Sequence, residues 1–128
     1  MIDTMATWHD IVRTRDAARL DALLAEDVVF HSPVVHTPQR GKAITSHYLR
    51  AALLVLNGAG FRYVREIVGE RDALLEFVTE LDGIQVNGVD LIRWNEYGQI
   101  VDFKVMVRPL KAINAVHQKM GEALQRKE

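Results

Sequence analysis

The stretch GVDLIRWNEYGQIVDFKVMVR, residues 88–108, decides the fold because it is typical of two β-strands joined by a tight turn. Residues 95–99 supply the turn, and Gly98 suits the positive φ that a type I turn followed by a bulge requires. With Gly98 as the bulge residue, Trp94 faces Ile100 and Asp90 faces Lys104, because side chains alternate along each strand. This register predicts a hairpin with two chemically different faces.

One predicted face is almost wholly apolar, and the other mixes apolar side chains with charged ones. The apolar face carries Val89, Leu91, Arg93, Val101, Phe103, Val105 and Val107. The mixed face carries Gly88, Asp90, Ile92, Trp94, Ile100, Asp102, Lys104, Met106 and Arg108. Two interpretations of the mixed face stay open: it lines a pocket, or it is solvated and gains only a weak Asp–Lys cross-strand attraction.

Length and composition predict a single domain spanning residues 1–128. The 16 basic and 17 acidic residues nearly cancel and are interspersed, so we expect no nucleic-acid partner. The chain has no cysteine, which excludes disulfides, thiol nucleophiles and thiolate metal sites. No basic leader and no apolar run of about 20 residues is present, so we expect no membrane partner and a cytoplasmic location.

The remaining segments predict an α+β fold. The first pattern indicates a helix with Met5, Trp8, Ile11 and Val12 on one face, and a short helix follows from about Asp16. A strand at 28–30 and a helix from Gly41 to Asn57 come next. Strands at 61–68 and 73–81, the hairpin above and a helix at 109–127 complete the chain. Strands gathered in one run favour α+β over a parallel sheet. We therefore predict a curved antiparallel sheet wrapped around the long helix, with an extra C-terminal helix.

Two segments resemble one known family. LLAEDVVFHSPVVHTPQRGKAI, residues 23–44, and GVDLIRWNEYGQIVDFKV, residues 88–105, resemble the ketosteroid-isomerase and polyketide-cyclase (SnoaL-like) branch of the nuclear-transport-factor-2-like superfamily. The resemblance covers about residues 5–108 and implies a cone-shaped fold, also called cystatin-like, that encloses a pocket. It also implies a homodimer formed through the outer face of the sheet, here the predicted apolar face. The C-terminal helix lies beyond the resemblance and would cover the pocket mouth or add to the dimer.

Only some of the catalytic groups of the isomerases have counterparts in this sequence. Ser32 stands where the isomerases carry their base carboxylate before a proline, and a neutral serine is no proton shuttle without a partner base. Their oxyanion-hole tyrosine falls at about Ile11, and only their oxyanion-hole aspartic acid has a counterpart, Asp90. The late acid of the related cyclases and epoxide hydrolases corresponds to Arg108, which is a permanent cation. We therefore do not expect classical ketosteroid isomerisation.

The candidate site is a polar set in an apolar pocket. Asp90, His31 and Lys104 are the predicted catalytic residues, with His31 as proton carrier, although strand parity turns His31 away if Ser32 faces the pocket. The predicted pocket lining is Trp8, Phe30, Ser32, Tyr48, Phe77, Ile92, Trp94, Asp102, Met106 and Arg108. His31, His36 and His47 match no zinc spacing, so we predict neither a metal nor a cofactor.

Three functions stay open. The first is an acid–base isomerase, cyclase or hydratase-like lyase acting on a small, largely apolar molecule. The second is a non-catalytic pocket that binds a small hydrophobic molecule bearing a carbonyl or carboxylate group, with Lys104 and Arg108 as anchors. The third is a dimeric association module of the same fold. A perturbed acid or base inside a closed pocket would favour the first function.

Overall fold

A computed structural model describes residues 2–58 and 60–125 of the chain. The helices are α1 (Thr4–Thr14), the 3-10 turn η1 (Ala17–Arg19), α2 (Leu20–Leu23), α3 (Lys42–Leu56) and α4 (Leu110–Leu124). The strands are β1 (Leu24–His31), β2 (Gln39–Arg40), β3 (Arg62–Val68), β4 (Asp72–Leu81), β5 (Ile84–Trp94) and β6 (Ile100–Arg108). The predicted α+β fold is therefore confirmed.

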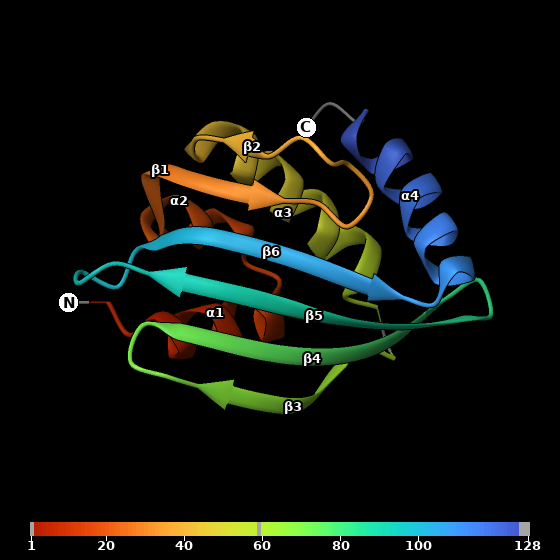
Figure 1. Cartoon of the computed structure of the whole chain (residues 1–128), viewed down its shortest axis with the longest axis horizontal. Helices are drawn as coiled ribbons and strands as arrows, with labels where there is room; N and C mark the ends of the chain where they lie inside the picture. Colours follow the sequence, from red (N-terminus) through yellow and green to blue (C-terminus); the bar gives the residue numbers. More distant parts are fainter. Residues whose placement is uncertain (1, 59, 126–128) are drawn as a thin grey trace.

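The six strands form one open sheet in the order β2-β1-β6-β5-β4-β3. All neighbouring strands run antiparallel except β1 and β6, which run parallel. The sheet is thus mixed: it agrees with the predicted antiparallel sheet except at the parallel pairing of β1 with β6. Helices α1 and α3 lie behind the sheet, and α4 stands at the end where β6 finishes (Figure 1).

The core lies between the sheet and helices α1 and α3. Trp8 and Ile11 on α1 are buried against the sheet, as the apolar stripe of this helix predicted, and Leu49 on α3 is buried there too. Asp3 caps α1 by accepting a hydrogen bond from the amide of Ala6, which satisfies one of the free amides at the helix start. The inward face of β4, Ala73, Leu75, Phe77 and Thr79, is buried, and Leu81 at the end of β4 pairs with Ile84 of β5.

The β5–β6 hairpin begins with the predicted turn but continues in a different register. Gly98 has a φ of +85°, and Trp94 pairs with Ile100 as expected. The next pair is Arg93 with Asp102, so Val101 is an extra residue on β6. From there onward the faces of β6 are exchanged relative to the prediction. Asp90 pairs with Val105 and not with Lys104.

The bulge at Val101 stabilises the fold through the side chains that it turns inward and outward. It turns Phe103 and Val105 inward, where they are 1% and 6% exposed, and turns the charged Asp102 and Lys104 outward. Burying two apolar side chains in place of two charged ones favours this register strongly. Phe103 and Val105 were predicted on the outer apolar face, and this was wrong because they face inward. Asp102, Lys104, Met106 and Arg108 were predicted on the pocket face, and this was wrong because they lie on the outer face.

Helix α4 follows its sequence pattern. Pro109 precedes α4, and Val116 and Met120 are buried on its inner face. The last residues of the predicted helix, 126 and 127, lie outside the described residues. Strand β1 begins at Leu24, earlier than the predicted start at Val28. Within residues 2–58 and 60–125, no helix is both long and apolar enough to cross a lipid bilayer.

Candidate functional site

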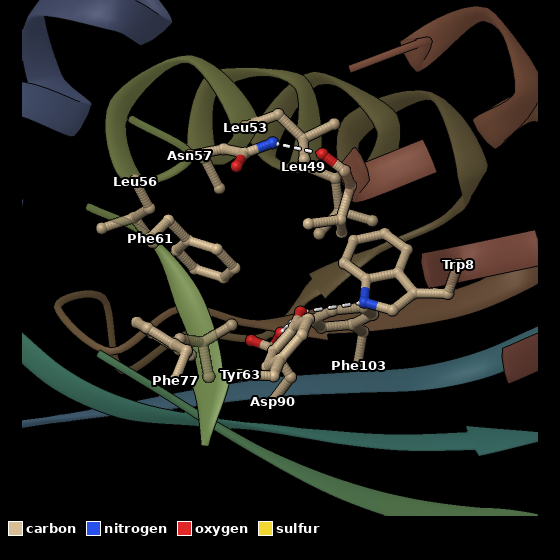
Figure 2. A pocket seen from close by; sticks show the side chains of 13 residues that line it. Trp8, Leu49, Leu53, Leu56, Asn57, Phe61, Tyr63, Phe77, Asp90 and Phe103 are labelled. Carbon is tan, nitrogen blue, oxygen red and sulfur yellow. Dashed lines mark hydrogen bonds between the residues drawn. The ribbon is translucent and has the colours of Figure 1, made fainter. Parts of the chain in front are cut away.

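A small cavity lies between the inner face of the sheet and helices α1 and α3. Its volume is about 40 Å³. This is room for a few water molecules, since one water needs roughly 10–15 Å³ by this measure. Most of the wall is apolar, and both the helices and the sheet contribute side chains to it. The prominent apolar side chains are Leu49, Leu53, Leu56, Phe61, Phe77 and Phe103 (Figure 2).

The polar groups of the cavity form a short hydrogen-bonded chain on the sheet side. The hydroxyl of Tyr63 donates to Oδ2 of Asp90 over 2.6 Å. The indole Nε1 of Trp8 donates in turn to the Tyr63 oxygen over 3.0 Å. These residues come from α1, β3 and β5, and Figure 2 shows their polar atoms converging at the cavity wall. Pairing of Tyr63 with Phe77 and of Leu75 with Asp90 brings Tyr63 and Asp90 to the same face of the sheet.

Burial controls the ionisation of this chain. Asp90 is 7% exposed, and removal from water raises the pKa of its carboxyl to about 7, although the hydrogen bond from Tyr63 acts in the opposite direction. Burial, followed by the neighbouring Asp90, raises the pKa of Tyr63 well above its ordinary value. At neutral pH, Tyr63 is therefore a neutral phenol, and Asp90 is present in both its protonated and its ionised form.

The opposite side of the cavity carries one further polar side chain, Asn57, at the end of α3. Its Nδ2 donates to the carbonyl oxygen of Val12 over 2.6 Å, which ties α3 to α1. Asn57, Val12, Phe61 and Tyr63 line both the cavity and an open cleft outside it. These four residues therefore form the mouth of the cavity.

This arrangement suits binding of a carbonyl oxygen and transfer of a proton. A protonated Asp90 has a hydrogen to donate, either to the Tyr63 oxygen or to a bound carbonyl. An ionised Asp90 is a base in an apolar environment, and a pKa near the working pH is what efficient proton transfer needs. Asp90 and Tyr63 are the ionisable side chains among the described residues that line the cavity.

The comparisons with known proteins agree with this fold. Residues 5–103 match the SnoaL-like domain family. The chain belongs to the SnoaL-like family. No curated protein matches the chain significantly. The nuclear-transport-factor-2-like superfamily and the SnoaL-like branch predicted from the sequence are confirmed.

Several solved structures are similar to this SnoaL-like protein. A steroid delta-isomerase from Pseudomonas aeruginosa is 37% identical, with a TM-score of 0.90 over 94% of this chain and 88% of that one. An uncharacterised cystatin-like protein from Silicibacter pomeroyi is 34% identical, with a TM-score of 0.86 over 95% and 85%. The epoxide hydrolase/cyclase-like enzyme SalBIII, at 14% identity and a TM-score of 0.65 over 83% and 88%, shares the fold.

In this SnoaL-like protein, three predicted site residues meet at the cavity. Trp8, Phe77 and Asp90 all line it. Ile92 is buried on the same face of the sheet but does not line the cavity. Phe30 packs on Tyr48 with ring centres 5.4 Å apart, in the core beside the cavity.

The other predicted site residues lie elsewhere. His31 points away from the cavity, as strand parity indicated, and its Nε2 lies 3.0 Å from Oδ1 of Asp102 on the outer face. Lys104 is on that face too, so a shared site of Asp90, His31 and Lys104 was wrong. Among the described residues, no group of three or more histidines and carboxylates is placed to share a metal ion.

The remaining predictions of the pocket lining were also wrong. Met106 is 48% exposed on the outer face of the sheet. Arg108 is exposed and donates to the side-chain oxygen of Asn87 over 3.2 Å. Ser32 accepts a hydrogen bond from the amide of Val34 in the turn after β1, away from the cavity lining. Trp94 lines a separate cleft near the N-terminal residues.

Tyr63 and Asn57 are the two polar side chains of the cavity that the sequence reasoning missed. Tyr63 alternates with Phe61 at the start of β3, and this pairing of aromatic residues is a signal that a buried face begins there. Its position opposite Phe77 depends on a bulge between Tyr63 and Arg65, which has no sequence marker. Asn57 was interpreted only as a helix stop, since asparagine is common there.

Proposed function

We propose that this protein binds a small, largely apolar carbonyl compound with its carbonyl end in the cavity and that Asp90 transfers a proton to or from it. The reaction class is isomerase-, cyclase- or lyase-like. The observation that carries the proposal is the buried Asp90 at an apolar cavity, with a pKa raised to about 7 and a hydrogen bond from Tyr63. The similarity to a steroid delta-isomerase at 37% identity supports the same reaction class.

Asp90 has two roles in this proposal. In its protonated form it donates a hydrogen bond to the carbonyl oxygen, which increases the acidity of the neighbouring carbon-bound hydrogens, and solvent water accepts the hydrogen that leaves. In its ionised form it removes such a hydrogen and later returns it to another carbon. Tyr63 and Trp8 hold the carboxyl in place through the hydrogen-bonded chain. A classical two-carboxylate ketosteroid mechanism is not proposed, because Ser32 stands at the position of the second carboxylate.

The experiment is exchange of the α-hydrogens of a simple enolisable ketone, indanone, in deuterium oxide, followed by proton NMR. The wild type should accelerate exchange, and Asp90→Asn should lose about 100-fold or more of that acceleration, as general acid–base groups contribute. Exposed Asp72→Asn is the matched control, since Asp72 pairs with Arg93 on the surface. Equal exchange rates for the wild type and Asp90→Asn would contradict the proposal.

A non-catalytic binding pocket is the second candidate, and the neutral Ser32 favours it because a second proton carrier is missing. In that case ketones bind and Asp90→Asn weakens their binding, while exchange is not accelerated. Intrinsic fluorescence reports binding directly, because Trp8 lines the cavity. The variant Trp94→Phe removes the other tryptophan and leaves Trp8 as the single indole fluorophore.

We also propose that two copies associate through the outer face of the sheet. Ile67 on β3 and Met106 on β6 are 55% and 48% exposed on this face, which also carries the charged Asp102 and Lys104 of β6. Burying exposed apolar side chains between charged neighbours is a common way to form a specific interface. Light scattering should give a dimer for the wild type and for Leu54→Glu on α3, and a monomer for Met106→Glu. A monomeric wild type would contradict the proposal.

A further inference from the structure

The cavity opens into a cleft of about 510 Å³ whose rim is rich in arginine. The cleft runs along α1 to the start of β3, and it shares Val12, Asn57, Phe61 and Tyr63 with the cavity. Figure 2 shows Asn57 and Phe61 among the side chains around the cavity. The part of a ligand that does not fit in the cavity would therefore lie in this cleft.

The charges around the cleft are unequal. Arg13, Arg15 and Arg62 line it, and Asp10 is the one carboxylate among its described lining residues. Asp10 is already paired with Arg13 and Arg19, which lower the pKa of its carboxyl, Arg19 most. Glu66 lies nearby and pairs with His9 over 2.5 Å. Asp10 and Glu66 are thus each engaged by a side chain.

Two arginines of the cleft remain available. Arg15 and Arg62 are exposed and form no ion pair with any other described residue. Arg15 ends α1 with a φ of +60°, and Arg62 begins β3, so both backbones are fixed by the elements that form the cavity mouth. A guanidinium presents paired donors that match a carboxylate or phosphate.

The small size of the cavity implies that a larger ligand occupies both the cavity and the cleft. About 40 Å³ accommodates little more than the carbonyl end of an organic ligand, so the rest of a larger molecule extends into the cleft. We infer that the ligand of this site carries an anionic group at the end opposite its carbonyl, and that Arg15 and Arg62 bind that group. This inference rests on the proposed function and specifies its ligand class: an apolar keto acid or a related anionic ketone.

The test compares ligands that differ only in this charge. The probes are benzoylpropionate and its longer homologue benzoylvalerate, each with its neutral methyl ester, measured by calorimetry at low salt. At least one carboxylate should bind roughly threefold to tenfold more tightly than its ester, as expected for two exposed ion pairs. The preference should fall as salt is raised, because exposed ion pairs are screened.

Variants separate this inference from the proposed function. The double variant Arg15→Gln/Arg62→Gln should remove the preference for the carboxylate and leave the affinity for the ester unchanged. Arg65→Gln is the matched control, because Arg65 is an exposed arginine of β3 that does not line the cleft. Asp90→Asn should weaken carboxylate and ester alike.

The outcomes are distinct. Carboxylates and esters that bind equally, both weakened by Asp90→Asn, would overturn the anionic ligand class and leave the proposed function standing. A preference that survives the double variant would overturn the roles of Arg15 and Arg62. If neither kind of ligand binds up to about 1 mM, or if Asp90→Asn has no effect on either, the proposed function fails together with the inference.

Discussion

The Tyr63 hydroxyl donates a 2.6 Å hydrogen bond to Asp90, a carboxyl that is otherwise enclosed by apolar side chains. The two residues are 27 positions apart in sequence and lie on different strands of the sheet. Burial raises the pKa of this carboxyl to about 7, and the hydrogen bond from Tyr63 opposes that rise. The contact therefore links the ionisation of Asp90 to the packing around the cavity.

The first prediction concerns stability and pH. The pKa of Asp90 is raised from 3.8 in the unfolded chain to about 7 in the folded one. The folded chain keeps a proton that the unfolded chain loses, so stability is full below pH 4 and falls as pH rises toward 7. The loss is on the order of 4 kcal/mol, and it should be absent in Asp90→Asn.

Urea unfolding of the wild type and Asp90→Asn between pH 4 and 8 measures this difference. Other groups titrate in both proteins and cancel in the comparison. The variant should be relatively more stable at pH 8 than at pH 4. A constant difference over this range would contradict the raised pKa.

The second prediction concerns Tyr63→Phe. The hydrogen bond from Tyr63 lowers the pKa of Asp90, so its removal should raise that pKa further. The change also leaves the Trp8 indole without its acceptor, and we expect a loss of about 1–3 kcal/mol of folding stability. The exposed Tyr97→Phe serves as control. The same Asp90 midpoint in Tyr63→Phe and the wild type would contradict the coupling.

How well the sequence predicted the site depended on the register of the β5–β6 hairpin. The turn at Gly98 and the inward position of Asp90 followed from residue type and strand alternation. The extra residue Val101 was not predictable from local pattern, because an isoleucine–valine pair suits either face of a strand. Its position is decided by the whole sheet, which gains by turning Phe103 and Val105 inward and Lys104 outward.

The fold was more predictable than the site for a physical reason. Helices and strands depend on repeated apolar spacing, and a single misplaced residue changes little of that pattern. A site depends on which of two faces each side chain takes, and one bulge reverses every residue after it. Tyr63 shows the same limit, because the bulge next to it in β3 sets its position opposite Phe77.

A third prediction tests the register directly. Lys104 lies on the outer face, so Lys104→Met should change folding stability by no more than about 0.5 kcal/mol and leave the Asp90 midpoint unchanged. Val105→Lys would place a charge on the buried face and should destabilise the fold strongly. Thermal unfolding of both variants measures this contrast. The reverse order of stability would support the unbulged register.

A fourth prediction concerns close packing on β5. A methyl group at Gly88 would lie 2.4 Å from Cζ of Phe77 and 2.8 Å from the carbonyl oxygen of Met106. Gly88→Ala should therefore cost about 1–3 kcal/mol of stability and displace Phe77 from the cavity wall. Gly121→Ala in α4 has open space and should be neutral or slightly stabilising. Equal melting temperatures for the two variants would contradict the packing.

The central claim is that Asp90 exchanges a proton near neutral pH inside the cavity. Carbon NMR of the Asp90 side-chain carboxyl, assigned by comparison with Asp90→Asn and titrated between pH 3 and 9, tests it most directly. The account predicts a midpoint of about 7. A midpoint near 3.8, the ordinary value of an aspartic acid, would show a permanently ionised carboxylate and contradict the proposed role of Asp90.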